Sequence, residues 1–391
     1  MSDPVHVVLV SIDGFRHDYP DLYPTPHIRR LVDEGVRARS LVPAWPTLTF
    51  PNHYSIATGL YPGHHGIVAN SFPDRSRGEW YRMSDRDAVG DGSWYGGEPV
   101  WVSAERAGLR TAAFYFVGTE ADVGGVRPTH WRPFSKDVPG DARVAQALEW
   151  LALPAAERPR LVTLYFEDVD DHAHWTGPDS PEAVEAIRRV DGWIGKLLDG
   201  IAALPHGDRV AVVLVSDHGQ RGYEDAPPFV IAEHVAPADL EGADIVEGGP
   251  YALFHFAEPD PARARRLASA INGAWRHGHA WLPENAPQDW RVEPGPRTPD
   301  LIVQADPGYA VLSRPEAKTK LTPGDHGWAP SDPAMHGIFI AAGPGLPAGR
   351  ALPSVHVVDV RPLILRWLRL DAAPGDGDPQ ALAGLLETPA D

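Results

Sequence analysis

Acidic and imidazole side chains follow the ends of short apolar runs in this sequence. Asp13 comes directly after the run Val5–Ile12. Asp217 and His218 come directly after the run Val210–Ser216. Carboxylates and imidazoles are the side chains that hold zinc and similar divalent ions in hydrolytic sites. This placement predicts a metal centre where the ends of the two runs meet.

A third apolar run, Leu161–Phe166, leads to another pair of metal-ligand side chains. Asp170 and His174 are four residues apart, so a helix after the run would point both side chains the same way. Taken singly, each such residue also has an ordinary role, as a turn residue, a helix N-cap or a solvated side chain.

Glycines lie beside the remaining candidate ligands. Gly219 follows His218 and predicts a sharp turn of the chain there. His326 lies in the glycine-framed run 324–327. In total there are three carboxylates and three imidazoles, which is enough to hold two metal ions with open coordination positions.

Thr47 and Thr49 are the candidate nucleophiles. Pro51 suits the first turn of a helix that ends at Gly59. A hydroxyl at the start of that helix feels the positive end of the helix dipole, which favours an alkoxide and a bound phosphoryl group. This reasoning does not distinguish the two threonines, and a threonine at a helix start is also an ordinary N-cap.

The candidate residues need a sheet to bring them together. Buried strands of a largely parallel sheet are predicted over Val5–Ile12, Leu161–Phe166, Val210–Ser216 and Gly337–Ala342. Helices are predicted over Pro26–Glu34, Val100–Ala107, Ala142–Ala152 and Pro181–Leu204, with Gly35 and Gly108 as C-caps. Strands that alternate with helices predict a doubly wound α/β fold, in which ligands bind beyond the carboxyl ends of the strands.

The periodic pattern loosens from about residue 221 to 320, where Pro, Gly and polar residues increase. No internal repeat stands out elsewhere in the sequence. We therefore expect a single catalytic domain over residues 1–391, with an elaborated insertion at about 221–320.

Composition limits the possible partners. The chain has 391 residues, no cysteine and a formal charge of −18. Any metal must then be held by His and carboxylates. A surface with this much negative charge repels nucleic-acid polymers. A small anionic substrate can still bind where metal ions supply positive charge. We expect a monomer or a homodimer.

The location expected from the sequence as written is cytoplasmic. The N-terminal apolar run lacks a basic leader and a small-residue cleavage site, so it is interpreted as a strand and not a signal peptide. A periplasmic or secreted location is expected instead if a signal has been removed. No run approaches the roughly 18 apolar residues of a membrane span, and no membrane association is expected.

Eight different short motifs are spread along the chain. They are Val8–Arg16, Thr49–Tyr54, Thr58–Pro62, His65–Ile67, Gly96–Trp101, Ser216–Gly219, Gly324–Gly327 and Met335–Gly337. Together they resemble the nucleotide pyrophosphatase/phosphodiesterase family of the alkaline phosphatase superfamily, and they are weakest from 221 to 300. The resemblance implies an alkaline-phosphatase-like three-layer α/β/α sandwich around a central, mostly parallel sheet. It also implies a compact catalytic domain of bacterial type.

The resemblance further implies a role for each site residue. It makes Thr49 the nucleophile. It assigns one zinc ion to Asp170, His174 and His326, and a second to Asp13, Asp217 and His218 with the Thr49 oxygen as a further ligand. Asn70 matches a residue that hydrogen-bonds a phosphate oxygen. Phe50 and Tyr165 match aromatic positions that sandwich a nucleobase, although both could be ordinary core residues.

Two positions depart from the family pattern. Ala173 replaces a glycine, and His172 competes with His174 as a ligand; the conserved four-residue spacing from Asp170 favours His174. Gln220 stands where the family often has methionine, and this change is expected to alter the rim of the site without touching a ligand.

The implied activity is zinc-dependent hydrolysis of phosphodiester or pyrophosphate bonds through a nucleotidyl-threonine intermediate, releasing nucleoside 5′-monophosphates. Alternatives are a phosphomonoesterase, a phosphonate hydrolase or a zinc-binding protein without activity. A monoester site usually adds Arg or Lys clamps, and the segment 43–70 contains neither, which favours diesters. A sulfatase with a cysteine-derived nucleophile is excluded because the chain has no cysteine.

Overall fold

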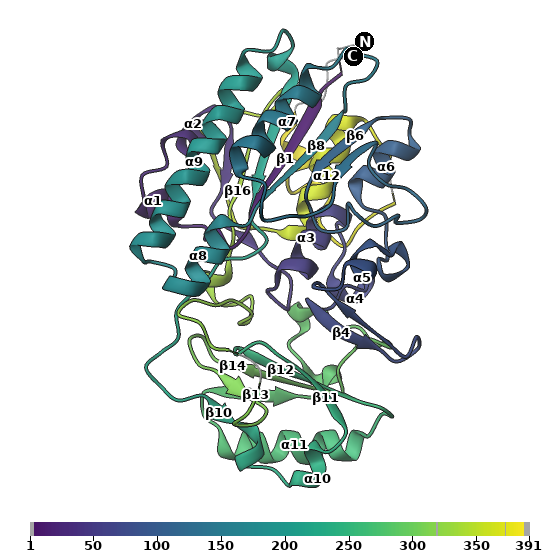
Figure 1. Cartoon of the computed structure of the whole chain (residues 1–391), viewed down its shortest axis with the longest axis vertical. Helices are drawn as coiled ribbons and strands as arrows, with labels where there is room; N and C mark the ends of the chain where they lie inside the picture. Colours follow the sequence, from purple (N-terminus) through teal and green to yellow (C-terminus); the bar gives the residue numbers. More distant parts are fainter. Residues whose placement is uncertain (1–3, 318–319, 372, 387–391) are drawn as a thin grey trace.

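A twisted eight-stranded sheet forms the centre of the computed structural model, which describes residues 4–317, 320–371 and 373–386 (Figure 1). The strand order is β17-β2-β16-β9-β1-β8-β6-β7. The strands are β1 (His6–Ile12), β2 (Val36–Ala38), β6 (Thr111–Phe114), β7 (His130–Arg132), β8 (Leu161–Phe166), β9 (Val210–Val215), β16 (Phe339–Ala342) and β17 (Arg350–Leu352). β1 lies at the centre and is parallel to both β8 and β9.

One predicted strand differs in direction. β16 pairs antiparallel with both of its neighbours, β9 and β2. The run Gly337–Ala342 is therefore a buried strand, as expected, but it is not part of the parallel set. Because β16 is reversed, its N-terminal end lies at the edge where β1, β8 and β9 finish, and the Gly219 amide donates to the Met335 carbonyl there over 2.8 Å.

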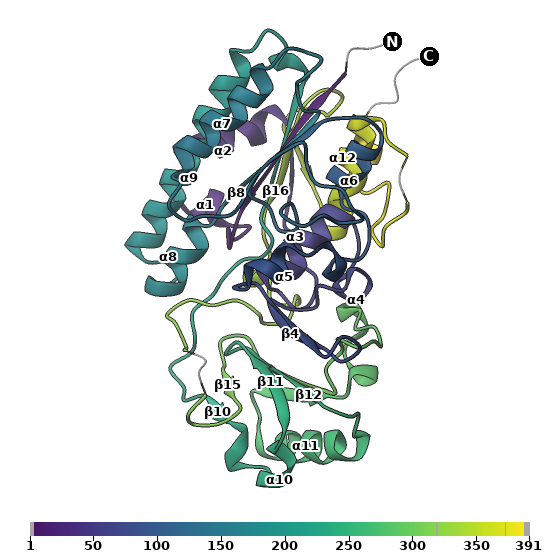
Figure 2. The same ribbon diagram turned by 45° about the vertical axis from the view of Figure 1, so that its right-hand side comes forward.

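Helices cover both faces of this sheet (Figure 2). On one face lie α2 (Pro26–Glu34), α7 (Gly140–Ala152), α8 (Asp168–Thr176) and α9 (Pro181–Ala202), and on the other α3 (Thr49–Thr58), α6 (Val100–Arg106) and α12 (Val360–Leu368). Successive side chains of β1 point to opposite faces of the sheet, so the strand packs against both helical layers. Val8 and Val10 belong to the core cluster with α7 and α9, while Val7 and Leu9 belong to the cluster with α3 and α12. The predicted α/β/α sandwich is confirmed.

The predicted helices are present, with ends within one or two residues of the expected positions. Gly59 ends α3 with the left-handed φ of 68° that favours glycine. Gly35 ends α2 in an extended conformation, so a different constraint applies: a Cβ there would lie 2.0 Å from the Ala341 carbonyl oxygen on β16. Gly108 has a φ of 77° just beyond α6.

A second sheet lies below the first in Figure 1, and the sequence analysis did not predict it. Its strands are β11 (Ala243–Glu247), β12 (Tyr251–Phe256), β13 (Gly278–Trp281) and β14 (Leu301–Ala305), in the antiparallel order β11-β12-β14-β13. It is covered by α11 (Pro261–Ala274) and flanked by β10 (Phe229–Val230), α10 (Pro237–Leu240) and β15 (Val311–Leu312). This sheet occupies the segment expected to be an elaborated insertion.

The two sheets share packing. Along β12, Ala252 and Phe254 point to a local cluster with α11, whereas Tyr251 and Leu253 belong to the main core cluster. Trp45 stacks on Trp290 with ring centroids 4.7 Å apart. The side chains of β12 thus pack the second sheet against the main core. That the chain is one domain with an insertion stays a prediction.

Shorter elements connect these layers, namely α1 (Tyr19–Leu22), β3 (Leu41–Val42), α4 (Pro62–His65), β4 (Ser71–Asp74), β5 (Glu79–Arg82), α5 (Arg86–Gly90) and β18 (Val355–His356). Within the described part of the chain, none of the helices combines the length and apolar character that a bilayer crossing requires.

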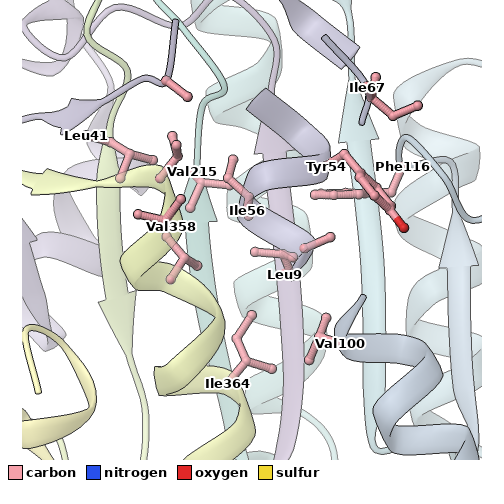
Figure 3. Packing of buried hydrophobic residues seen from close by; sticks show 14 of the residues in the cluster. Leu9, Leu41, Tyr54, Ile56, Ile67, Val100, Phe116, Val215, Val358 and Ile364 are labelled. Atoms are coloured by element: carbon pink, nitrogen blue, oxygen red, sulfur yellow. The ribbon is translucent and has the colours of Figure 1, made fainter. Parts of the chain in front are cut away.

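Leu9 is fully buried between β1 and the helices of one face (Figure 3). We expect Leu9→Ala to lower the free energy of unfolding by about 2–5 kcal/mol, because it removes buried methyl groups and leaves a cavity. Urea denaturation measures this change. Leu22, which is 55% exposed, is the control: Leu22→Ala should change the same quantity by less than about 0.5 kcal/mol. Equal effects of the two substitutions would contradict the assigned core.

Candidate functional site

The carboxyl ends of the parallel strands gather the six predicted metal ligands into two groups. One group is Asp13, Asp217 and His218, and the other is Asp170, His174 and His326. Within each group, one ligand atom from every residue lies within 4.8 Å of the others. The first group is buried, and the second is buried in part.

The first group comes from neighbouring strand ends. β1 and β9 pair in register up to Ser11 and Val215, so the residues that follow them meet at the sheet edge. His218 Nε2 lies 3.4 Å from Asp13 Oδ1 and 3.1 Å from Asp217 Oδ2. Both carboxylate oxygens are buried and have no hydrogen-bond partner among the described residues.

The second group combines a helix and a returning loop. Asp170 and His174 lie one turn apart on α8, with Nε2 of the histidine 3.5 Å from Oδ2 of the aspartate. His326 arrives from the loop that follows the second sheet, and its Nε2 lies 3.9 Å from Asp170 Oδ1. The rings of His218 and His326 stack with centroids 3.7 Å apart, so the two groups are adjacent.

Backbone carbonyls orient all three histidines in the same way. Nδ1 of His174 lies 2.9 Å from the Gly324 carbonyl, and Nδ1 of His218 lies 3.0 Å from the Gly219 carbonyl. Nδ1 of His326 lies 2.8 Å from the carbonyl of residue 47. An Nδ1–H that donates to a carbonyl leaves the Nε2 lone pair free, and metal-binding histidines commonly have this arrangement.

The electrostatics of the first group favour a bound cation. Burial, and then repulsion from neighbouring carboxylates, raises the pKa of Asp13 and of Asp217 well above the usual range. Burial lowers the pKa of His218. Buried carboxylates without hydrogen-bond partners, next to neutral imidazoles, make a donor set that fits divalent metal ions of the zinc type.

The structure separates the two candidate threonines. Thr47 is fully buried; its hydroxyl donates to the Trp328 carbonyl and accepts from the Gly327 amide. Thr49 is the first residue of α3, and its Oγ1 lies 3.3 Å from His218 Nε2. The N-cap position belongs to Leu48. Thr49 is therefore the hydroxyl that lies beside the ligand groups.

An aromatic cavity of about 200 Å³ opens at Thr49. Its lining includes the predicted pair Phe50 and Tyr165, together with Phe116 and Phe134. We call it the aromatic cavity. The Tyr165 hydroxyl donates to Asp13 Oδ2 over 2.6 Å, so this residue also fixes a carboxylate of the first group. That the predicted pair sandwiches a nucleobase stays a prediction.

Asn70 lies close to the start of α3. Its Oδ1 accepts a hydrogen bond of 2.9 Å from the Phe50 amide. This bond fixes the orientation of the side chain, and the amide NH₂ is the end left for a ligand. Asn70 and Thr49 line one further cavity together, next to the second ligand group.

Sequence reasoning missed several residues of the aromatic cavity. Phe134 carries no motif, and it reaches the cavity from the loop after β7. Arg86 and Lys136 also line the cavity, paired with Glu120 and Asp171. Basic side chains therefore do lie near the site, although the segment 43–70 contains none. The absence of Arg and Lys from that segment does not by itself favour diesters over monoesters.

The expectation for Gln220 was wrong. This side chain is fully buried, and its Nε2 donates to Oδ1 and to the backbone carbonyl of Asp170, so it touches a ligand directly. His172 lies outside both groups, with its Nδ1 2.7 Å from the Asp168 carbonyl, as the choice of His174 requires.

The reason for Gly219 also differs from the expectation. Its φ is not in the left-handed region, and a Cβ there would lie 2.2 Å from the Ala334 carbonyl oxygen. Close approach of the chain before β16, and not a sharp turn, requires glycine at this position. Gly327 does need its conformation, with a φ of 108°.

Comparison with known proteins agrees with this geometry. A sequence model of the family "Type I phosphodiesterase / nucleotide pyrophosphatase" matches residues 7–329. Human ectonucleotide pyrophosphatase/phosphodiesterase family member 1 is 30% identical over 98% of this chain, which spans 42% of that relative. A venom phosphodiesterase of Crotalus durissus collilineatus is also 30% identical, and this chain spans 46% of it. The chain thus covers less than half of these relatives' length.

A solved structure extends the similarity to the fold. Murine ectonucleotide pyrophosphatase/phosphodiesterase 5 superposes with a TM-score of 0.90 at 27% identity, over 98% of this chain and 100% of the solved one. A second structure of the same murine protein is of a variant in which alanine replaces a threonine; it is described as inactive and as a complex with AMP.

If the second group holds a divalent metal ion, we expect Gln220→Met to weaken its binding by about 10- to 100-fold, because Asp170 loses the donor that orients it. Competition with a chromogenic chelator measures the affinity. His172→Ala is the matched control, and it should leave the affinity unchanged. Weaker metal binding by His172→Ala would instead place that histidine in the ligand set.

The raised pKa of Asp217 leads to a stability prediction for the metal-free protein. Stability from a group with a raised pKa is present below its unfolded pKa and is lost as the pH rises through its folded pKa. The Asn side chain of Asp217→Asn carries no charge, so at pH 8 in chelator we expect the Tm of this variant to exceed that of the wild type by roughly 1–3 °C. The difference should shrink toward pH 4. Thermal unfolding at both pH values checks this, and a lower Tm for the variant at pH 8 would contradict it.

Proposed function

This chain belongs to the type I phosphodiesterase / nucleotide pyrophosphatase family, and on that premise we propose that it hydrolyses phosphodiester or pyrophosphate bonds in nucleotides. The products are nucleoside 5′-monophosphates. The observation that carries the proposal is the position of Thr49 Oγ1, 3.3 Å from His218 Nε2 and on the wall of the aromatic cavity. Loss of a threonine inactivates the murine relative that was solved with AMP, which supports a threonine nucleophile.

Two zinc ions are the proposed cofactors. Asp170, His174 and His326 would hold one ion, and Asp13, Asp217 and His218 would hold the other together with the Thr49 oxygen. When bound, the ions lower the pKa of the threonine hydroxyl and offset the negative charge of the phosphoryl group and the leaving oxygen. The three Nε2 atoms, which point away from the backbone carbonyls that fix the rings, and the unpartnered carboxylate oxygens support this assignment.

Thr49 carries the covalent chemistry. Its Oγ forms a bond to phosphorus while the bond from phosphorus to the leaving oxygen breaks, and the hydroxyl proton passes to solvent. The product of this step is a nucleotidyl-threonine. Water then attacks the same phosphorus, releases the monophosphate and restores the hydroxyl.

Two features near Thr49 stabilise charge on phosphorus. The N-terminus of α3 offers the positive end of its dipole, and its N-cap residue, Leu48, makes no side-chain capping bond there. Asn70 is fixed by the Phe50 amide, so its NH₂ group can donate to an equatorial oxygen.

The aromatic cavity would hold the nucleoside half of the substrate. Phe50 and Tyr165 are the proposed walls for the base, and Phe134 offers a third ring in the same cavity. Nucleobases stack on aromatic side chains with little dependence on base identity. A phosphodiester that contains a nucleoside therefore fits the site better than a small phosphate monoester.

We expect the zinc-loaded protein to convert ATP to AMP and pyrophosphate, and Thr49→Ala to lower kcat by at least about 10³-fold because the nucleophile is lost. Anion-exchange chromatography identifies the products, and circular dichroism controls for folding. Formation of ADP and phosphate would contradict the proposed bond. Full activity of Thr49→Ala would remove the assigned nucleophile.

A second assay separates diesters from monoesters. We expect faster nitrophenol release from the nitrophenyl ester of thymidine 5′-monophosphate than from nitrophenyl phosphate, because only the diester has a nucleoside to place in the aromatic cavity. Treatment with EDTA should abolish both reactions. Preference for nitrophenyl phosphate would establish a phosphomonoesterase in place of the proposed function.

A further inference from the structure

Two adjacent side chains of α3 bind the backbone at the point where the helix begins. Asn52 is fully buried, and its amide NH₂ group donates to the carbonyls of Pro46 and Leu48 over 3.0 Å each. Its Oδ1 accepts from the Ala44 amide over 2.7 Å. These bonds fix the segment that leads into Thr49.

The Thr49 backbone is held by the next side chain, His53, which is also fully buried. Nδ1 of His53 lies 2.9 Å from the Thr49 carbonyl oxygen. A carbonyl only accepts, so Nδ1 carries the hydrogen and donates it. In the neutral ring Nε2 is then an acceptor, and the Ser11 hydroxyl donates to it over 2.9 Å. Ser11 belongs to β1, so the ring ties the start of α3 to the central strand of the main sheet.

The His53 ring also borders the first ligand group. Its Nδ1 lies 3.2 Å from Asp217 Oδ2. The rings of His53 and Tyr165 meet edge to face with centroids 5.2 Å apart, and the hydroxyl of this tyrosine donates to Asp13. The His53 ring therefore fills the space between the start of α3 and the buried carboxylates, and its position sets the distance between them.

Resting on the proposed function, we infer that His53 is a positioning residue, which places the Thr49 hydroxyl relative to the first ligand group through the bond from Nδ1 to the Thr49 carbonyl. Its two ring nitrogens are bonded to Thr49 and Ser11, so His53 offers no polar atom to a substrate. A reacting oxygen displaced by about 1 Å lowers the rate of attack by about 100-fold. The nucleoside in the aromatic cavity rests on other side chains, so loss of the bond lowers kcat and leaves KM nearly unchanged.

Two substitutions separate the Nδ1 bond from the volume of the ring. His53→Asn keeps an NH₂ donor near the position of Nδ1, whereas His53→Gln reaches toward the position of Nε2 and has no donor near Nδ1. For ATP hydrolysis by the zinc-loaded protein, we expect His53→Gln to lower kcat by about 10- to 100-fold and His53→Asn to keep it within about threefold of the wild type. KM should change by less than about threefold in both variants. A role that depends on volume alone predicts the opposite order, since glutamine is the larger side chain.

His65→Gln is the matched control. His65 is fully buried as well, and its Nε2 bonds to the Ser55 hydroxyl further along α3. This variant makes the same change of side chain against the same helix, and it should keep kcat within about twofold because Thr49 retains its bond to His53.

Hydrogen exchange of the metal-free protein gives a readout that needs no activity. Peptides that cover the first turn of α3 should exchange faster in His53→Gln than in the wild type, and at close to the wild-type rate in His53→Asn.

A kcat for His53→Asn as low as that of His53→Gln, or an unchanged kcat in His53→Gln, would overturn the inference. If neither variant folds, Ser11→Ala decides in their place, because it removes the hydroxyl that fixes the ring: it should lower kcat by about 3- to 10-fold at unchanged KM, and an unchanged kcat would overturn the inference. Absence of AMP from ATP with the wild type would overturn the proposed function instead. Hydrogen exchange then decides the role of His53, and equal exchange in the wild type and His53→Gln would count against it.

Discussion

Repulsion between buried carboxylates is the constraint on which this site depends. Asp13 and Asp217 follow adjacent strands, and burial together with neighbouring acidic groups raises the pKa of both. Such a cluster is costly unless a cation or a proton offsets the charge. The fold accepts this cost at the edge where parallel strands end, since the strands themselves are fixed by apolar residues such as Leu9 that lie away from the charges.

The rest of the site is arranged around that charge. The three histidines donate to backbone carbonyls and so present the same nitrogen inward. Tyr165 and Gln220 each donate to a carboxylate, one in each ligand group. These donors are neutral, so they hold the acidic side chains in fixed positions without offsetting their negative charge. The carboxylates therefore keep their full attraction for a metal ion.

Half of the strands of the main sheet, β1, β8, β9 and β16, could be predicted from the sequence, and the membership of the two ligand groups followed from the resemblance to the family. Uninterrupted β-branched runs identify the four predicted strands, whereas β2, β6, β7 and β17 are only three or four residues long and show no such run. The second sheet was missed because Tyr251–Phe256 and Leu301–Ala305 lie among Pro, Gly and polar residues that obscure their period. The contact between Gln220 and Asp170 and the entry of Phe134 depend on tertiary packing, which local spacing does not contain.

His326 reaches the site only after the chain has built the second sheet. Asp13, Asp217 and His218 are all present once β9 has been synthesised, whereas the other group waits for a ligand more than a hundred residues later. On a ribosome, the residues of the buried acidic group therefore all emerge before the residue that completes the other group. During synthesis the chain therefore carries all three residues of one ligand group while the other group still lacks its last residue.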